Sequence, residues 1–167
     1  MNAKRLIPLA FTAILLLGAC RGRHSSALSA ESHAPGTTLA RTPAACQAYP
    51  AGAPGVIRTF CNGPAKVNLT VAGVTHPLAG GVCRPSDGAF NLDLGVVSGP
   101  DLAGPKPDHV GLTAPVAAGA FNGATLAVTV DGKAYAVRRN DGQVSPAGGS
   151  FEGVADSGEV IKADFTC

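Results

Sequence analysis

The side chain with the clearest chemistry is the thiol of Cys20, which ends the tetrapeptide Leu17-Gly18-Ala19-Cys20. Lys4 and Arg5 stand near the start of the chain, and the following residues, Leu6–Ala19, are almost entirely apolar. A basic start, a short apolar run and small residues before a cleavage point are typical of an export signal, and this run is too short to span a bilayer comfortably. A cysteine after Leu-Gly-Ala is typical of the lipobox of bacterial lipoproteins, in which the thiol is acylated. The sequence therefore predicts lipidation at Cys20.

The four other cysteines predict two disulfide bonds. They are Cys46, Cys61, Cys83 and Cys167, an even number in a chain predicted to be exported. Four cysteines allow three pairings. We favour Cys46–Cys61, which closes a short Pro/Gly-rich loop, and Cys83–Cys167, which ties the early core to the final residue. In the loop-entropy model the longer closure stabilises by about 4–5 kcal/mol. No Cys-x-x-Cys motif occurs, which argues against redox or zinc chemistry.

No residue pattern predicts catalysis. Gly148-Gly149-Ser150-Phe151-Glu152 does not match the Gly-x-Ser-x-Gly turn of a nucleophilic serine, and we interpret it as a turn entering a strand. Metalloprotease, Walker and dinucleotide-binding motifs are absent. Four aspartates precede or nearly precede a glycine, and turns explain them better than paired-carboxylate catalysis does; these are Asp87, Asp131, Asp141 and Asp156. We therefore predict that the protein is not an enzyme and needs no cofactor.

The histidines offer one alternative, a metal site. Two of the four lie within residues 20–45, a predicted tether, and cannot form a preorganised site. His76 and His109, with Asp93 or Asp108, are the alternative set. Their spacing matches no known metal-ligand pattern. We interpret both histidines as structural and predict no metal.

The composition fits one exported domain without a nucleic-acid partner. Removing residues 1–19 from the 167-residue chain leaves 148 residues, enough for one domain. Lys4 and Arg5 leave with the leader, so 11 of the 13 basic residues remain against 11 acidic ones and the formal net charge is zero. No basic run is present to bind nucleic acid. The partner that we predict is the membrane, through the lipid on Cys20.

The remainder divides into a tether and a folded domain. Residues 20–45 contain Ser, Thr, Pro and Gly without apolar periodicity, which predicts a flexible tether. Residues 46–167 are the predicted globular β domain. Within it, Asp131-Gly132 stands between two alternating runs, Thr125–Val130 and Lys133–Arg138, and predicts a two-residue type I′ hairpin. A further turn is expected at Asn140–Gly142 and a loop over Pro115–Asn122.

Short alternating runs dominate the domain, and no segment has a convincing helical period. Such runs, with turns every 8–15 residues, predict a mainly β fold. We expect a small, disulfide-stapled antiparallel β-sandwich or open barrel of about seven or eight short strands. A single antiparallel sheet with one short helix packed on it is the alternative.

Four short segments in the domain resemble a known family. They are Gly81-Val82-Cys83, Asp87–Leu92, Asn122–Leu126 and Ala163–Cys167. Their order and spacing, with the lipobox and the tether, resemble the mycobacterial nineteen-kilodalton lipoprotein antigen family over about Lys66–Cys167. The chain departs from that pattern in its additional Cys46 and Cys61 and in a shorter last turn. The resemblance implies a surface or envelope lipoprotein with antigenic properties and no established enzymatic activity.

These observations together predict a lipid-anchored protein of the bacterial cell membrane or outer membrane, whose domain faces the periplasm or the exterior. The expected role is binding, structural or antigenic. The alternative is a periplasm-facing carrier that binds a lipid or another small apolar ligand in a cleft between sheet faces.

Overall fold

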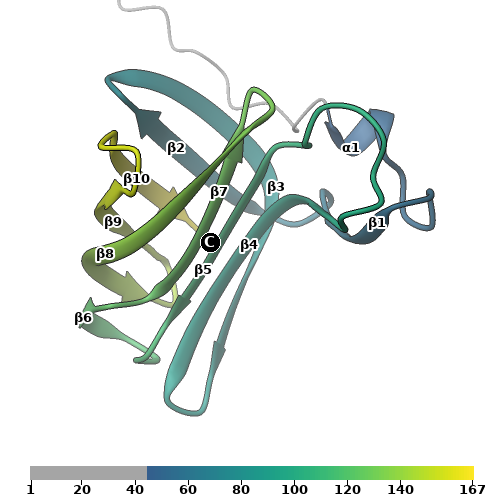
Figure 1. Ribbon diagram of the computed structural model, residues 1–167. Helices are drawn as coiled ribbons and strands as arrows, with labels where there is room; N and C mark the ends of the chain where they lie inside the picture. The colour runs from purple at the N-terminus through teal and green to yellow at the C-terminus, as the bar shows by residue number, and fades with distance from the viewer. Residues whose placement is uncertain (1–44) are drawn as a thin grey trace, which may run out of the picture. The chain divides into compact units, whose positions relative to one another are not determined.

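A computed structural model describes residues 45–167 (Figure 1). The predicted leader, residues 1–19, and nearly all of the predicted tether, residues 20–45, lie outside the described residues, and Cys20 lies there too. The elements are α1 (Ala45–Ala48), β1 (Val56–Phe60), β2 (Ala65–Val71), β3 (Val74–Ser86), β4 (Ala89–Ser98), β5 (His109–Ala114), β6 (Gly119–Asn122), β7 (Thr125–Val130), β8 (Lys133–Ser145), β9 (Gly148–Ala155) and β10 (Val160–Thr166).

Eight antiparallel strands form a closed barrel, in the order β4-β3-β2-β10-β9-β8-β7-β5. Pairing of β5 with β4, from Phe90↔Ala114 to Gly95↔His109, closes the ring. The prediction of a mainly β, antiparallel, disulfide-stapled fold is confirmed. The sequence favoured a sandwich or an open barrel, and the structure is a closed barrel. Closure was not predicted because no local pattern reveals that β5 pairs with both β4 and β7.

Two short strands extend the long strands β4 and β8. Strand β1 pairs with β4 at Gly95–Ser98, beyond the part of β4 that pairs with β3. Strand β6 pairs with Asp141–Val144 of β8, beyond the part that pairs with β7. Residues Asn140–Gly142 therefore lie inside a strand, and the predicted turn there is wrong. Strand β6 also replaces part of the predicted loop over Pro115–Asn122.

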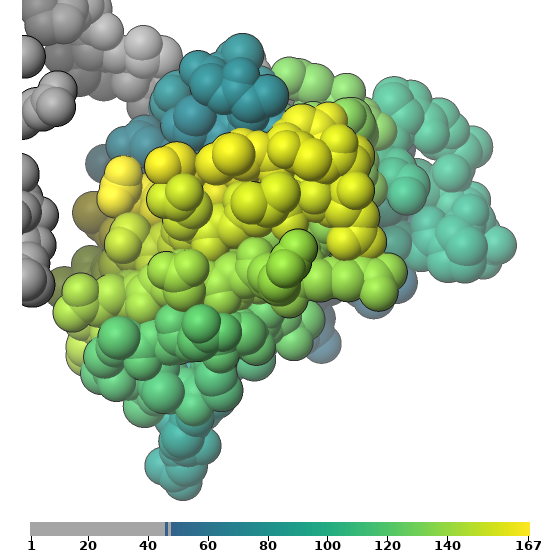
Figure 2. Space-filling model, turned by 60° about the vertical axis from the view of Figure 1, so that its left-hand side comes forward, coloured from purple at the N-terminus to yellow at the C-terminus, as the bar shows by residue number. Residues whose placement is uncertain are grey.

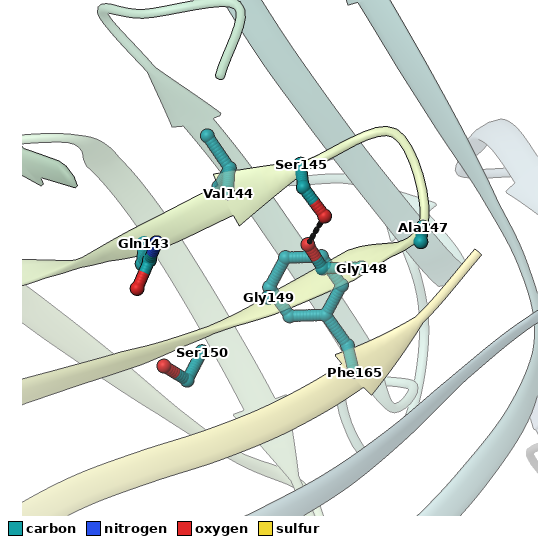
Figure 3. Close-up of a pocket in the computed structure, with 8 residues that line it drawn as sticks. All are labelled: Gln143, Val144, Ser145, Ala147, Gly148, Gly149, Ser150 and Phe165. Carbon is teal, nitrogen blue, oxygen red and sulfur yellow. Dashed lines mark hydrogen bonds between the residues drawn. The ribbon is translucent and has the colours of Figure 1, made fainter. Parts of the chain in front are cut away.

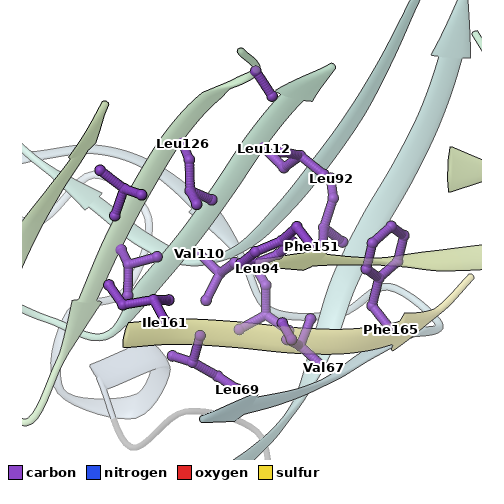
Figure 4. Close-up of a cluster of buried hydrophobic side chains, with 14 of the residues drawn as sticks. Val67, Leu69, Leu92, Leu94, Val110, Leu112, Leu126, Phe151, Ile161 and Phe165 are labelled. Carbon is purple, nitrogen blue, oxygen red and sulfur yellow. The ribbon is translucent and has the colours of Figure 1, made fainter. Parts of the chain in front are cut away.

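The barrel interior is filled by side chains from every strand of the ring (Figure 4). Phe90, Leu94 and Ile161 are fully buried, and the ring of Phe90 lies 5.8 Å from that of Phe165. An eight-stranded barrel is just wide enough for its own side chains. Glycines face inward where large rings need room: an ideal Cβ on Gly149 would lie 2.9 Å from Cζ of Phe165.

The tight turns follow the predicted chemistry. Asp131 and Gly132 have φ values of 51° and 78°, so both occupy the left-handed region that a type I′ hairpin requires. The hairpin between β7 and β8 is thereby confirmed. The β2–β3 turn uses the same geometry at Ala72 and Gly73, with φ values of 50° and 84°. In these residues, 45–167, no helix is long and apolar enough to cross a membrane.

Candidate functional site

Two disulfide bonds staple the barrel, as predicted. Cys46 is bonded to Cys61, and Cys83 is bonded to Cys167, with Cα–Cα distances of 6.0 and 5.7 Å. These are the pairs that the spacing favoured. The first joins α1 to the residue after β1, and the second joins β3 to the end of β10. Both Cys83 and Cys167 pack against the core, so this bond is part of the filled interior.

The two histidines of the domain lie on opposite sides of the barrel wall. His76 has the same strand parity as buried Leu78 and faces the barrel mouth, where its Nδ1 lies 3.6 Å from a carboxylate oxygen of Asp131. His109 precedes inward-facing Val110 and therefore faces outward. The alternative metal site that joined them is not formed. Residues 45–167 contain no group of three or more His, Cys, Asp or Glu side chains arranged to hold a metal ion.

The imidazole of His109 lies over Gly111, the next outward position of β5. A Cβ on Gly111 would meet Cε1 of His109 at 2.9 Å and Nε2 at 3.3 Å. Nε2 is buried and has no hydrogen-bond partner among the described residues. Burial lowers the pKa of His109 below its ordinary value, and the nearby Asp93 carboxylate opposes that shift. Removal from water therefore favours the neutral form of the ring.

The two carboxylates of the alternative metal set, Asp93 and Asp108, both accept hydrogen bonds from other groups. Asp93 accepts a hydrogen bond of 2.6 Å from Arg84. Asp108 accepts one of 3.0 Å from the backbone N–H of Asp131. No hydrogen bond joins either carboxylate to Nε2 of His109.

A pocket of about 320 Å³ opens beside His109, between the β4–β5 connection and the outer faces of β5, β7 and β8. Its floor is one row of the sheet, where His109 pairs with Thr129 and Thr129 with Ala134. Its wall is made by the two ends of the connection. We call it the His109 pocket; its lining is Val96, Val97, Ser98, Gly99, Pro100, Lys106, Pro107, His109, Ala127, Thr129 and Ala134.

A second pocket, of about 290 Å³, lies at the β8–β9 hairpin (Figure 3). Gly148 and Gly149 leave it open, and the ring of Phe165 lies at its base. The Ser145 hydroxyl donates to the carbonyl of Gly148 at 2.9 Å, so it supports the turn. No titratable side chain lines this pocket. Ser150, the serine of the segment that does not match the Gly-x-Ser-x-Gly turn, therefore has no histidine beside it in the lining.

Figure 2 shows the outer face over β8, β9 and β10, whose outward side chains include paired charges. Lys162 contacts Glu152 at 2.9 Å, and both side chains are about half exposed. Nearby, Lys133 on β8 donates to Glu159 at 2.5 Å. That hydrogen bond, together with one from Ser157, lowers the pKa of Glu159 to about 2. Lys162 and Glu152 lie on the neighbouring strands β10 and β9, whereas Glu159 lies in the turn between those strands. Ion pairs at a surface contribute little to stability.

The His109 pocket was not predicted from the sequence. Its small floor residues, Ala127, Thr129 and Ala134, occupy the outward positions of two adjacent strands. The alternation of β7 was visible in the sequence, but the register that sets Thr129 beside His109 was not. The pocket is therefore a product of strand pairing over a long sequence separation.

Comparison with known proteins adds no identity. No family model matches the chain, and neither a curated protein nor a solved structure is similar to it. The resemblance to the nineteen-kilodalton lipoprotein antigen family therefore stays a prediction from short segments.

Proposed function

We propose that the protein is a lipid-anchored lipoprotein of the bacterial cell envelope with a non-catalytic binding, structural or antigenic role. The observation that carries the proposal is the Leu17-Gly18-Ala19-Cys20 motif after a basic and apolar leader. The disulfide pattern supports it, because the other four of the five cysteines are bonded to one another and Cys20 remains for acylation. Disulfides also fit an exported chain.

The filled barrel supports the non-carrier form of the proposal. A carrier with a cleft between sheet faces needs an internal cavity, whereas the inward positions of β4, β5 and β10 hold fully or nearly fully buried Leu, Val, Ile and Phe side chains. Durable anchoring takes two or more acyl chains, since one chain binds reversibly.

The decisive measurement is the intact mass of the protein purified from its native membrane, before and after reduction. A mass that starts at Cys20 and includes two or more acyl chains is expected, with a gain of four hydrogens when the two disulfides are reduced. An unmodified mass that retains residues 1–19 would contradict the proposal.

A variant pair tests the anchoring itself. Cys20→Ala is expected to move the protein from the membrane fraction to the soluble fraction. Ser26→Ala, in the same predicted tether, should leave the protein in the membrane fraction. Equal membrane partitioning of Cys20→Ala and the unaltered protein would contradict the assignment of Cys20 as the lipidated residue.

A further inference from the structure

The His109 pocket has the polarity of an anion site. Its polar side chains are Ser98, Lys106, His109 and Thr129, each of which can donate a hydrogen bond, and its lining contains neither Asp nor Glu. Lys106 makes no ion pair with any of the described residues. Outside the lining, the carboxylates of Asp93 and Asp108 accept hydrogen bonds from Arg84 and from the backbone N–H of Asp131. A carboxylate ligand would therefore meet donors without an opposing acid in the pocket.

The rest of the lining is apolar and small. Ala127 and Ala134 leave the floor open, and Val96, Pro100 and Pro107 form apolar wall. The backbone of Lys106 pairs with that of Gly132, which fixes this wall over the β7–β8 turn. A volume of about 320 Å³ is at the small end of ligand pockets. It suits a ligand with a short aliphatic chain.

The imidazole of His109 is free to take part. Nε2 is buried against Gly111 without a hydrogen-bond partner, so the ring can turn toward the pocket without breaking a hydrogen bond. A buried polar atom without a partner is costly, and a ligand oxygen would supply the missing partner. Side-chain rotation of this kind is common on binding.

We propose that the His109 pocket binds a small aliphatic carboxylate. The carboxylate accepts hydrogen bonds from the ammonium of Lys106 and from Nε2–H of the turned His109 ring. The aliphatic chain lies over Ala127 and Ala134. The inference goes beyond the proposed envelope role and does not depend on lipidation of Cys20.

The test is a titration of the full, disulfide-oxidised protein, with its histidine rings ¹³C-labelled, with butyrate. We expect a saturable shift of the His109 ring resonance at millimolar butyrate. His76 faces the barrel mouth, so its resonance is an internal control that should not move. Butyramide, which has the same size without the charge, should shift His109 only at concentrations at least about tenfold higher, because charge-assisted hydrogen bonds are roughly twice as strong as neutral ones.

Variants locate the effect. Lys106→Gln removes the cation and should weaken butyrate binding about tenfold, the ratio that corresponds to one hydrogen bond to a charged group. Ala134→Leu fills the exposed floor and should weaken binding by at least that factor. Lys66→Gln, on β2 away from the pocket, should leave binding unchanged. An immobile His109 resonance, equal effects of butyrate and butyramide, or wild-type affinity in Lys106→Gln and Ala134→Leu would each overturn the proposal.

Discussion

The barrel interior and the His109 pocket lie on the two sides of the same strands, yet one is filled and the other is hollow. On β7 the inward residues are Leu126, Val128 and Val130, whereas the outward residues include Ala127 and Thr129. Large apolar residues on one parity close the core, and small residues on the other leave space under the β4–β5 connection. The difference shows that one alternating strand can specify a core and a surface hollow together.

The largest effect should come from loss of the Cys83–Cys167 disulfide bond, which packs against the core. Replacing Cys83 and Cys167 with alanine should lower the free energy of unfolding by about 4–5 kcal/mol, because their closure is long. The Cys46→Ala, Cys61→Ala pair closes a shorter loop and should cost about 3 kcal/mol. Urea unfolding of the oxidised variants measures both. A larger loss from the Cys46–Cys61 pair would show that the link between α1 and the end of β1, and not the link between β3 and β10, limits stability.

The contrast between the two faces can be tested with one substitution on each. Phe90→Ala leaves a cavity in the filled interior and should cost about 3–5 kcal/mol. Thr129→Ala, at the pocket floor, should change the free energy of unfolding by no more than about 0.5 kcal/mol. Thermal unfolding followed by circular dichroism compares them. Similar losses from both variants would mean that the pocket floor is packed as tightly as the core.

The lowered pKa of His109 predicts a pH dependence of stability. Its pKa in the folded protein lies below the ordinary 6.5, so the unfolded chain binds more protons in that range. The free energy of unfolding should therefore fall as the pH decreases from 6.5 toward the folded pKa. His109→Gln should remove this fall, whereas Thr129→Ala, in the same pocket, should keep it. Urea unfolding between pH 7 and pH 5 measures the slope; identical slopes in His109→Gln and the unaltered protein would count against burial as the cause.

The smallest effect is expected on the exposed outer face, in a more acidic range. The pKa of Glu159 is lowered to about 2 from 4.5, so its contribution is present above pH 4.5 and is lost as the pH falls toward 2. Lys133→Gln should raise the pKa of Glu159 toward 4.5, which carboxyl ¹³C resonances report. Lys162→Gln, which breaks the pair with Glu152, should leave that value unchanged. A Glu159 pKa that stays near 2 in Lys133→Gln would assign the shift to other groups.

Local patterns were sufficient for much of the fold. The Asp131-Gly132 turn is specified by two residues whose positive φ values need no distant partner. The turn predicted at Asn140–Gly142 is wrong. Its Asp-Gly pair is the same signal as that of Asp131-Gly132, but these residues lie inside β8. There Gly142 leaves room for the ring of Phe121, whose Cζ would lie 2.7 Å from an added Cβ. A glycine that serves packing is indistinguishable in sequence from one that serves a turn.

The candidate site needed more than local patterns. Strand parity separates His76, which lies on the same face of its strand as buried Leu78, from His109, which faces outward next to buried Val110. The pairing of Thr129 with Ala134 follows from the predicted Asp131-Gly132 hairpin, whereas the pairing of His109 with Thr129 depends on the register between β5 and β7. No short turn joins β5 to β7, so that register, and with it the pocket, is seen only in the folded structure.

The place of β10 in the ring has a consequence for biosynthesis. This strand, Val160–Thr166, pairs with β9 on one side and with β2, Ala65–Val71, on the other. Strand β2 therefore keeps one edge without its partner until residues 160–166 have left the ribosome and, in the proposed setting, crossed the membrane. Pairing over so long a separation slows folding and exposes strand edges meanwhile. If the protein is exported as proposed, the barrel cannot close before translocation of β10, so the chain would cross the membrane unfolded. Until β10 pairs with β2, the open strand edges would need protection from aggregation.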